Sequence, residues 1–488
     1  MGTASSGEWI AILLYFALVI GVGVYFFIRD RHVEGEKEYF LGGRSMGGWV
    51  AALSAGASDM SAWVLMGLPG SIYLYGIGKV WIAVGLVIGT ICAWVFVAPR
   101  LRRYSIRAND SITIPQFLTN RFQSKNKGLQ IISAIVFVVV YCIYSASSIS
   151  ACGTLFNTVT GMSAKTAMII ATAIILVYVF LGGFNAVCWT DFFQGMLMLA
   201  ALLVAPIFAL FMLKGVGVHP VDTPNFFNPF SSWKDIVSGL GWGLGYFGMP
   251  HIIIRFMSLE SQKSLKKSAK IGISWTLLIV IFAALVGIIG RLFLGFDETI
   301  NGHSLVFITM VRRIFPGVIS GILLSAVLAA SMSTADSQLL TAASAFASDV
   351  YKPVIRKGQA GEKEMLWAGR LVVLAIAVVA LLIASDPEAG TIMSLVSNAW
   401  GVFGAAFGPA IMLSLFWKRF TFSGAVAGIL VGAGVDVLWL LCLSSTGIYE
   451  IIPGTAAGLI ACIVVSLLSR KPDADVEALY DKAVAYND

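Results

Sequence analysis

The strongest constraint on this chain is its succession of apolar runs, each long enough to cross a lipid bilayer. About 20 apolar residues span the roughly 30 Å hydrocarbon core of a membrane. The 488-residue sequence contains about thirteen such runs, at 8–28, 48–73, 79–98, 128–156, 164–182, 189–213, 236–256, 272–294, 305–346, 366–385, 391–416, 421–444 and 451–469. We therefore expect an all-α polytopic membrane protein, in which the overlong ninth run is one span with a helical extension.

Lysine and arginine collect in every second loop between these runs, including 29–47, 99–127, 257–271 and 347–364, whereas 445–450 and the other alternate loops have almost none. Only 12% of the residues are charged, about half the share in soluble domains, so their placement is informative. Basic loops mark the cytoplasmic side. With thirteen spans, the N-terminus is expected outside and the C-terminus in the cytoplasm. The net charge of +7 then reflects orientation in the membrane, and no nucleic-acid partner is expected.

Two of the runs contain helix-weakening residues near their middle. The run 48–73 is interrupted by "SAGASDMS" and the run 236–256 by "GWGLGYFGMP", and each opens a group of five runs. Glycine and proline weaken or break helices, and broken helices at matching positions in two halves point to a transporter's binding site. Close helix packing through the same glycines is the alternative.

Asp59 lies inside the first interrupted run. A carboxylate at the centre of an inserted helix costs about 2.5–3.5 kcal/mol. Its retention favours a role in attracting or coordinating a cation, and a structural partnership with a buried hydroxyl or backbone amide is the alternative.

A second polar cluster lies in "SAVLAASMSTADSQLL", residues Ser325–Leu340. Ser333, Asp336 and Ser337 are spaced by three and four residues, so a helix presents them on one face. Thr334 and Ala330 lie beside this face. Hydroxyl, carboxylate and carbonyl oxygens are ligands for hard cations, although hydroxyls also bond back to their own helix.

Signatures of enzymes are missing from the sequence. It has no Walker A sequence, no GxGxxG opening a strand–helix unit and no histidine cluster. We therefore expect neither catalytic residues nor an organic cofactor.

Several stretches resemble one family. They are "FLGGRSMGGWVAALSAGASDMSAWVLMGLPGSIY", "LGGFNAVCWTD", "GWGLGYFGMPHIIIRFM", "GILLSAVLAASMSTADSQLL", "NAWGVFGAAFGPAIMLSLFW" and "GIYEIIPG". The chain is similar over about residues 38–470 to the sodium:solute symporter family, and most of all to its proline-transporting bacterial members.

The resemblance implies a LeuT-type inverted five-plus-five repeat with extra flanking helices. The implied division has an N-terminal helix and loop (1–47), a first repeat (48–235), a second repeat (236–420), two C-terminal spans (421–470) and a cytoplasmic tail (471–488).

The family's functional positions can be carried over residue by residue. The implied Na⁺ ligands are the carbonyls of Ala57, Met60 and Ala330 with the hydroxyls of Ser333 and Thr334. The implied solute site comprises Ser61, Ala62, Tyr144, Trp242, Tyr246 and Pro250. Positions implied for a second cation or for coupling are Asp59, Asp191, Asp336, Ser337 and Arg44.

Three positions depart from the pattern of the proline-transporting members. Ala62 stands where glycine is usual, which adds a methyl group to the solute site. Lys79 and Thr309 each stand where glutamate is expected. Lys79 is interpreted either as a lysine snorkelling at its span end or as a change in the access path or in coupling.

The resemblance implies Na⁺-coupled uptake of L-proline across the cytoplasmic (inner) membrane of a bacterium, with no obligatory protein partner. A sugar, sialic acid, a monocarboxylate or pantothenate is the alternative solute. A non-transporting sensor is disfavoured because only about 18 residues follow Arg470, too few for a soluble output domain. A channel is disfavoured because aromatic side chains are expected to block the pathway.

Overall fold

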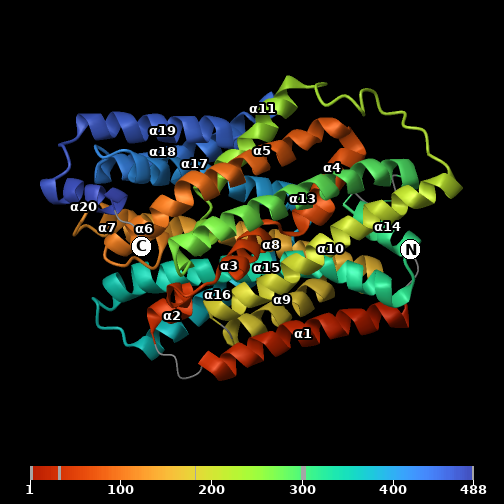
Figure 1. Cartoon of the computed structure of the whole chain (residues 1–488), viewed down its shortest axis with the longest axis horizontal. Helices are drawn as coiled ribbons and strands as arrows, with labels where there is room; N and C mark the ends of the chain where they lie inside the picture. The colour runs from red at the N-terminus through yellow and green to blue at the C-terminus, as the bar shows by residue number, and fades with distance from the viewer. Residues whose placement is uncertain (1–3, 31–34, 182, 298–299, 301–303, 486–488) are drawn as a thin grey trace.

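The structure of this chain is a computed structural model that describes residues 4–30, 35–181, 183–297, 300 and 304–485. The regular elements in this part of the chain are helices, most of which run along the long axis of the molecule (Figure 1). Residues 31–34 of the expected basic loop 29–47 lie outside the described part.

Ten helices in the described part of the chain are long and apolar enough to cross a membrane. They are α1 (Ser6–Asp30), α5 (Val80–Cys92) continued by α6 (Ala98–Arg107), α8 (Gly128–Thr160), α10 (Phe184–Val216), α13 (Gln262–Leu294), α15 (Gly317–Phe346), α16 (Glu362–Ala384), α17 (Ile392–Phe416), α18 (Phe422–Cys442) and α19 (Ile451–Leu468). The remaining three apolar runs form α9 (Ala164–Leu181) and two interrupted spans. Each of the thirteen runs thus corresponds to helical structure.

The first interrupted span breaks directly after Asp59. It consists of α3 (Gly48–Asp59), a π-helical turn η2 (Trp63–Gly67) and α4 (Leu68–Tyr75). Met60 leaves the helical conformation, with φ −84° and ψ 74°. The break frees backbone groups in the middle of the molecule.

The second interrupted span is broken by glycines and a proline. It consists of α11 (Trp233–Gly241), a 3₁₀ segment η5 (Trp242–Phe247) and α12 (Pro250–Ser258). Met249 is extended, and Pro250 takes the first position of α12, where a missing N–H costs nothing.

The ninth run is a span with a helical extension, as expected. The short helix α14 (Val306–Ile314) precedes α15, and Pro316 separates the two. At its other end α15 continues into the π-helical η7 (Ala347–Ile355). Nearly every residue of α15 from Leu323 to Ala345 is buried, so α15 is the central helix of the molecule.

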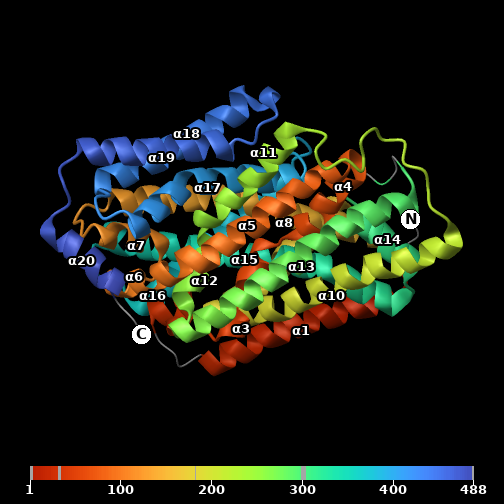
Figure 2. The same ribbon diagram turned by 45° about the horizontal axis from the view of Figure 1, so that its top comes forward.

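The remaining helices cover this centre. Helix α1 lies along one side, and the pair α18 and α19 lies along the opposite side, against α17 (Figures 1 and 2). Glycines bring α5 and the second interrupted span together, since a Cβ on Gly85 would lie 2.2 Å from the Gly239 carbonyl oxygen. A Cβ on Gly89 would lie 2.4 Å from that of Gly243.

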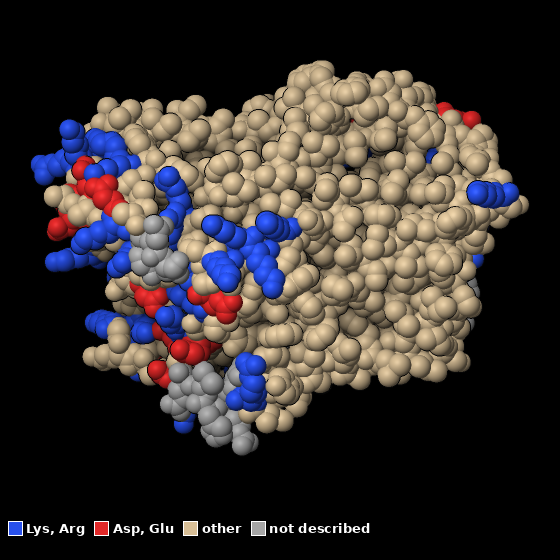
Figure 3. Space-filling view, viewed as in Figure 1, with Lys and Arg blue, Asp and Glu red and all other residues tan. Residues whose placement is uncertain are grey.

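Charged side chains gather at one end of the long axis, over α6, α7 (Ile114–Arg121) and α20 (Ala474–Ala485) (Figure 3). A broad band with few charges covers the rest of the visible face. Short helix α2 (Glu36–Leu41) lies at the same charged end (Figure 1). The alternation of basic loops along the sequence therefore becomes a separation of charge along the molecule.

Candidate functional site

The carboxyl group of Asp59 is buried where both interrupted spans meet. Its side chain is 1% exposed, and Tyr246 donates a hydrogen bond from its hydroxyl to Oδ2. Among the described residues, Oδ1 has no hydrogen-bond partner. One carboxylate oxygen is therefore held by η5, while the other remains available to a further donor or a cation.

The break in α3 and the central helix α15 are joined through Ser333. Its hydroxyl donates to the carbonyl oxygen of Ala57 at 2.9 Å and lies 3.2 Å from that of Ala330. Thr334 is fully buried, and its hydroxyl finds no partner among the described residues. Met60 is the non-helical residue at the end of α3. Oxygens of Ala57, Ala330 and Ser333 thus converge beside an unsatisfied hydroxyl, a donor set that suits a dehydrated alkali cation.

Aromatic rings form a wall around η5. The Trp242 ring lies 5.9 Å from Trp63, 6.1 Å from Trp400 and 5.2 Å from Tyr449. The Trp400 indole N–H donates to the carbonyl oxygen of Trp242 at 2.8 Å, which fixes the 3₁₀ segment against α17. Tyr246 packs edge-on against Trp400.

The remaining expected solute residues come from α8, from the break in the first span and from the start of α12. Tyr144 of α8 is fully buried beside the His251 ring, and its hydroxyl has no hydrogen-bond partner among the described residues. Ser61 and Ala62 are buried in the break of the first span, and Pro250 is buried at the start of α12. The expected solute residues therefore come from three elements that face one another.

The space beside Asp59 is small. A cavity bordered by Asp59, Thr90 and Tyr246 has a volume of about 10 Å³. This is room for about one water molecule, whereas pockets for small ligands hold about 300–1,000 Å³. Of the expected solute residues, only Tyr246 lines this cavity, so it is a space on the α5 and α13 side of Asp59.

Asp191 of α10 is neutralised by an arginine. Its Oδ2 accepts from Ser54 at 2.7 Å and from Arg255 Nη2 at 3.1 Å, with both charged side chains at most 1% exposed. Ser337 also lies within hydrogen-bond distance of Asp191 and of Asp336. The structure thus brings together Asp191, Asp336 and Ser337, whereas Ser333 points toward Ala57. A second cation at this position stays a prediction.

Arg44 connects several elements at the charged end of the molecule through hydrogen bonds. It donates to Asp110 Oδ1 at 2.9 Å, to the Ser111 carbonyl at 2.7 Å and to the Met257 carbonyl at 2.6 Å. Burial raises the pKa of Asp110, but the Lys37 hydrogen bond and the Arg44 charge outweigh it, so the net shift is downward. This set of contacts ties the loop before α3 to the end of α12.

A short backbone pairing adds to this attachment. Met46 donates from its N–H to the Ser258 carbonyl at 3.1 Å and accepts from the Glu260 N–H at 3.2 Å. Arg102 donates to the carbonyl oxygens of Leu259 and Glu260. We call the contacts of Arg44, Met46 and Arg102 with residues 257–260 the inner latch.

Lys79 and Thr309, the two positions where glutamate was expected, lie away from the site. Lys79, the residue directly before α5, forms an ion pair of 2.7 Å with Asp235 of α11 at the end opposite the inner latch. Both side chains are about a quarter to a third exposed, so this pair contributes little to stability. Thr309 lies on α14, with its hydroxyl unpartnered among the described residues.

Sequence reasoning missed several residues of the site. Arg255, His251, Trp400 and Tyr449 all lie in stretches that carried the family resemblance, yet none was singled out. Arg255 had a usable signal, because a charged residue inside an apolar run marks a functional position. The roles of the two aromatic residues depend on ring contacts that no spacing rule shows.

The family model of the "Sodium:solute symporter family" matches residues 39–432. The chain is 44% identical to the "High-affinity proline transporter PutP" of Bacillus subtilis, over 96% of this chain and 99% of that protein. It is 42% identical to the "Sodium/proline symporter" of Staphylococcus aureus, over 99% and 98%.

Solved structures share the fold. A Na⁺-coupled sialic acid symporter in a substrate-bound outward-open state matches with a TM-score of 0.80 and 19% identity, covering 96% of this chain and 99% of that one. MhsT in complex with L-phenylalanine matches with a TM-score of 0.54 and 15% identity, covering 86% and 97%. The interrupted spans, the extent of the family match and the identity to these relatives agree: the chain belongs to the sodium:solute symporter family.

Proposed function

We propose that the chain is a secondary active transporter that couples Na⁺ entry to the uptake of L-proline. The observation that carries the proposal is the junction at Ser333, where the hydroxyl of this α15 residue lies within hydrogen-bond distance of the carbonyl oxygens of Ala57 in the broken span and Ala330. The names of the bacterial relatives, "Sodium/proline symporter" among them, support Na⁺ as the coupling ion and proline as the solute.

The proposed Na⁺ site uses the carbonyls of Ala57, Met60 and Ala330 with the hydroxyls of Ser333 and Thr334. Its support is the convergence of three of these oxygens and the unsatisfied hydroxyl of Thr334. A Na⁺ ion here would be liganded by both α3 and α15. Its binding therefore favours whichever arrangement of the two helices completes the oxygen cage.

The proposed solute site lies on the other side of the same break. Proline is a small zwitterion with an apolar ring, which suits Trp242 as an aromatic wall and the broken segment at Ser61 and Ala62 as a polar wall. Tyr144 offers a buried hydroxyl that has no partner among the described residues. Because the Ala62 methyl reshapes this space, another small solute of the family is the second candidate.

Coupling follows if Na⁺ and solute stabilise the same arrangement of the broken spans. Tyr246 links the proposed coupling residue Asp59 to the solute site, because its hydroxyl donates to the Asp59 carboxylate and its ring lies in the aromatic wall. Each Na⁺ is driven inward by about 2.3 kcal/mol per 100 mV of membrane potential. One ion per solute then supports accumulation of roughly tens-fold.

The proposed orientation places the N-terminus outside and the charged end, with the inner latch, in the cytoplasm of a bacterium. Its support is the clustering of lysine and arginine at that end (Figure 3). We also propose that 48–235 and 236–420 are the two inverted repeats, each opening with an interrupted span.

Proteoliposomes loaded without Na⁺ test the function directly. An inward Na⁺ gradient is expected to drive radiolabelled L-proline above its external concentration, whereas choline or a pH gradient alone is not. Equilibration without accumulation would indicate a channel, and no flux with any solute would indicate a sensor. Accumulation of a sugar, sialic acid, a monocarboxylate or pantothenate, with proline excluded, would move the assignment to the second candidate.

The orientation is tested with single cysteines in a background without the six native ones. Cysteines replacing the exposed Lys125 and Lys266 should resist an impermeant thiol reagent in intact cells, and react after the membrane is opened. A cysteine replacing Ser445, in the loop before α19, should react in intact cells and serves as the control. The reverse pattern would overturn the orientation.

The sodium site is tested by Ser333→Ala and Thr334→Ala. Each change removes one ligand of a dehydrated ion, so half-maximal uptake should need about tenfold or more Na⁺, with a smaller change in solute affinity at saturating Na⁺. Ser331→Ala is the matched control, because the Ser331 hydroxyl bonds back to Val327 on the same helix. A normal Na⁺ curve for both site variants would remove these residues from the site.

The role of Asp59 is tested by comparing Asp59→Asn with Asp59→Glu. Asparagine keeps the size and a partner for Tyr246 but removes the charge, so uptake should fall sharply and need much higher Na⁺. Glutamate should retain more activity, since the charge is kept. If Asp59→Asn instead lowers the yield of folded protein while the surviving transporter keeps its Na⁺ response, the carboxylate is structural.

A further inference from the structure

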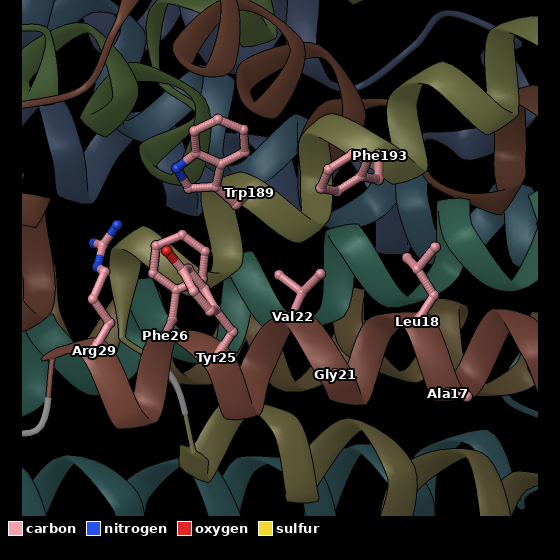
Figure 4. Close-up of a pocket in the computed structure, with 9 residues that line it drawn as sticks. All are labelled: Ala17, Leu18, Gly21, Val22, Tyr25, Phe26, Arg29, Trp189 and Phe193. Atoms are coloured by element: carbon pink, nitrogen blue, oxygen red, sulfur yellow. The ribbon is translucent and has the colours of Figure 1, made fainter.

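A groove runs along the outside of the molecule between α1 and α10 (Figure 4). It has a volume of about 470 Å³, and its apolar walls include Leu18, Gly21, Val22, Phe26, Trp189 and Phe193. The side chains of α1 point toward the two rings of α10 across this space (Figure 4). Its volume falls in the range of small-ligand pockets.

The length of the groove along α1 is close to the thickness of one leaflet of a bilayer. From Ala17 to Arg29 the helix α1 rises by about 18 Å, and half of a hydrocarbon core is about 15 Å. Gly21 creates the hollow, because no atom lies within 4 Å of the position that a Cβ would take. Trp189 and Phe193 are 36% and 43% exposed, so the rings are open to the membrane.

A second, polar cavity lies beside the Arg29 end of this groove. That cavity holds about 270 Å³ and shares Arg29 with the groove. The Arg29 guanidinium lies 4.3 Å from the centre of the Phe26 ring, at the junction of the two spaces. Glu38, Ser45 and Asn185 border the polar part, and Glu38 has no ion-pair partner among the described residues.

We propose that the groove and the polar cavity together bind one molecule of phosphatidylethanolamine. One acyl chain would fill the apolar groove, the phosphate would meet Arg29, and the primary ammonium would meet Glu38. Arginine matches a phosphate with several N–H donors, and an ammonium can donate to a carboxylate. A lipid headgroup with only negative charge would be repelled by the Glu38 carboxylate. A choline headgroup has no N–H to donate to this carboxylate, so both classes of lipid are expected to bind more weakly than phosphatidylethanolamine.

The proposed lipid site lies on the same turn of α10 as the buried Asp191. Trp189 precedes Asp191 by two residues on α10, and Asp191 forms the buried ion pair with Arg255. Groove and ion pair therefore occupy different faces of one helical turn. The lipid inference does not depend on which solute is carried, because it rests on α1, α2 and the outer face of α10.

Native mass spectrometry of the full-length protein tests the proposal. The protein is purified from membranes containing phosphatidylethanolamine and phosphatidylglycerol, and retained lipids are counted while detergent washing is extended. The wild type should keep one phosphatidylethanolamine. Gly21→Leu fills the hollow, and Arg29→Gln removes a charge-assisted contact, so each should lower occupancy about tenfold.

Two further variants sharpen the assignment. Glu38→Gln should shift the preference toward phosphatidylglycerol. Gly434→Leu is the matched control, because Gly434 is likewise exposed on α18 with nothing within 4 Å of an added Cβ. It should retain lipid as the wild type does.

Three results would overturn the proposal. They are equal lipid retention in Arg29→Gln and the wild type, equal loss in Gly434→Leu and Gly21→Leu, and a preference of the wild type for phosphatidylglycerol that Glu38→Gln leaves unchanged. Because Glu38 borders the polar cavity and not the groove, Glu38→Gln tests the headgroup contact even if Gly21→Leu reduces the yield of folded protein.

Discussion

A helix that stops inside a membrane must satisfy its freed backbone groups within the protein, because hydrocarbon offers no hydrogen bonds. Helix α3 stops at Asp59, and the surroundings of this break follow from that constraint. The Ala57 carbonyl meets the Ser333 hydroxyl, Tyr246 holds the Asp59 carboxyl, and buried helices enclose both. The hydroxyl of Ser333 thus ties the buried helix α15 to the interrupted span.

Much of this architecture could be predicted from the sequence. Thirteen apolar runs, two of them interrupted, correspond to the helical spans, because length and hydropathy dominate membrane insertion. The two breaks could be located because glycine, proline and a lone acid weaken a helix in any surroundings. The spacing of Ser333 and Asp336 placed them on one helix, although the structure directs Ser333 toward Ala57 and Asp336 toward Ser337.

The partners of the charged groups could not be predicted in the same way. Asp191 and Arg255 are 64 residues apart, and only the packing of both α10 and α12 against α3 and α15 brings them within 3.1 Å. Lys79 and Asp235 likewise meet because glycines let α5 approach the second interrupted span. The family resemblance implied the sodium and solute positions, which stay predictions, and the structure adds the hydrogen bond from Tyr246 to Asp59.

The inner latch has a consequence for the empty protein. Hydrogen bonds to a charged group contribute about 1.5–3 kcal/mol each, and Arg44 makes several of them, with the loop after α6 and with the end of α12. Separating these two elements therefore costs free energy unless another interaction offsets the loss of the hydrogen bonds. A carrier that opened this end with Na⁺ alone would let Na⁺ enter without solute, and this uncoupled entry would dissipate the Na⁺ gradient. In a Na⁺-coupled carrier, contacts of this strength at one end lower the frequency of such leakage.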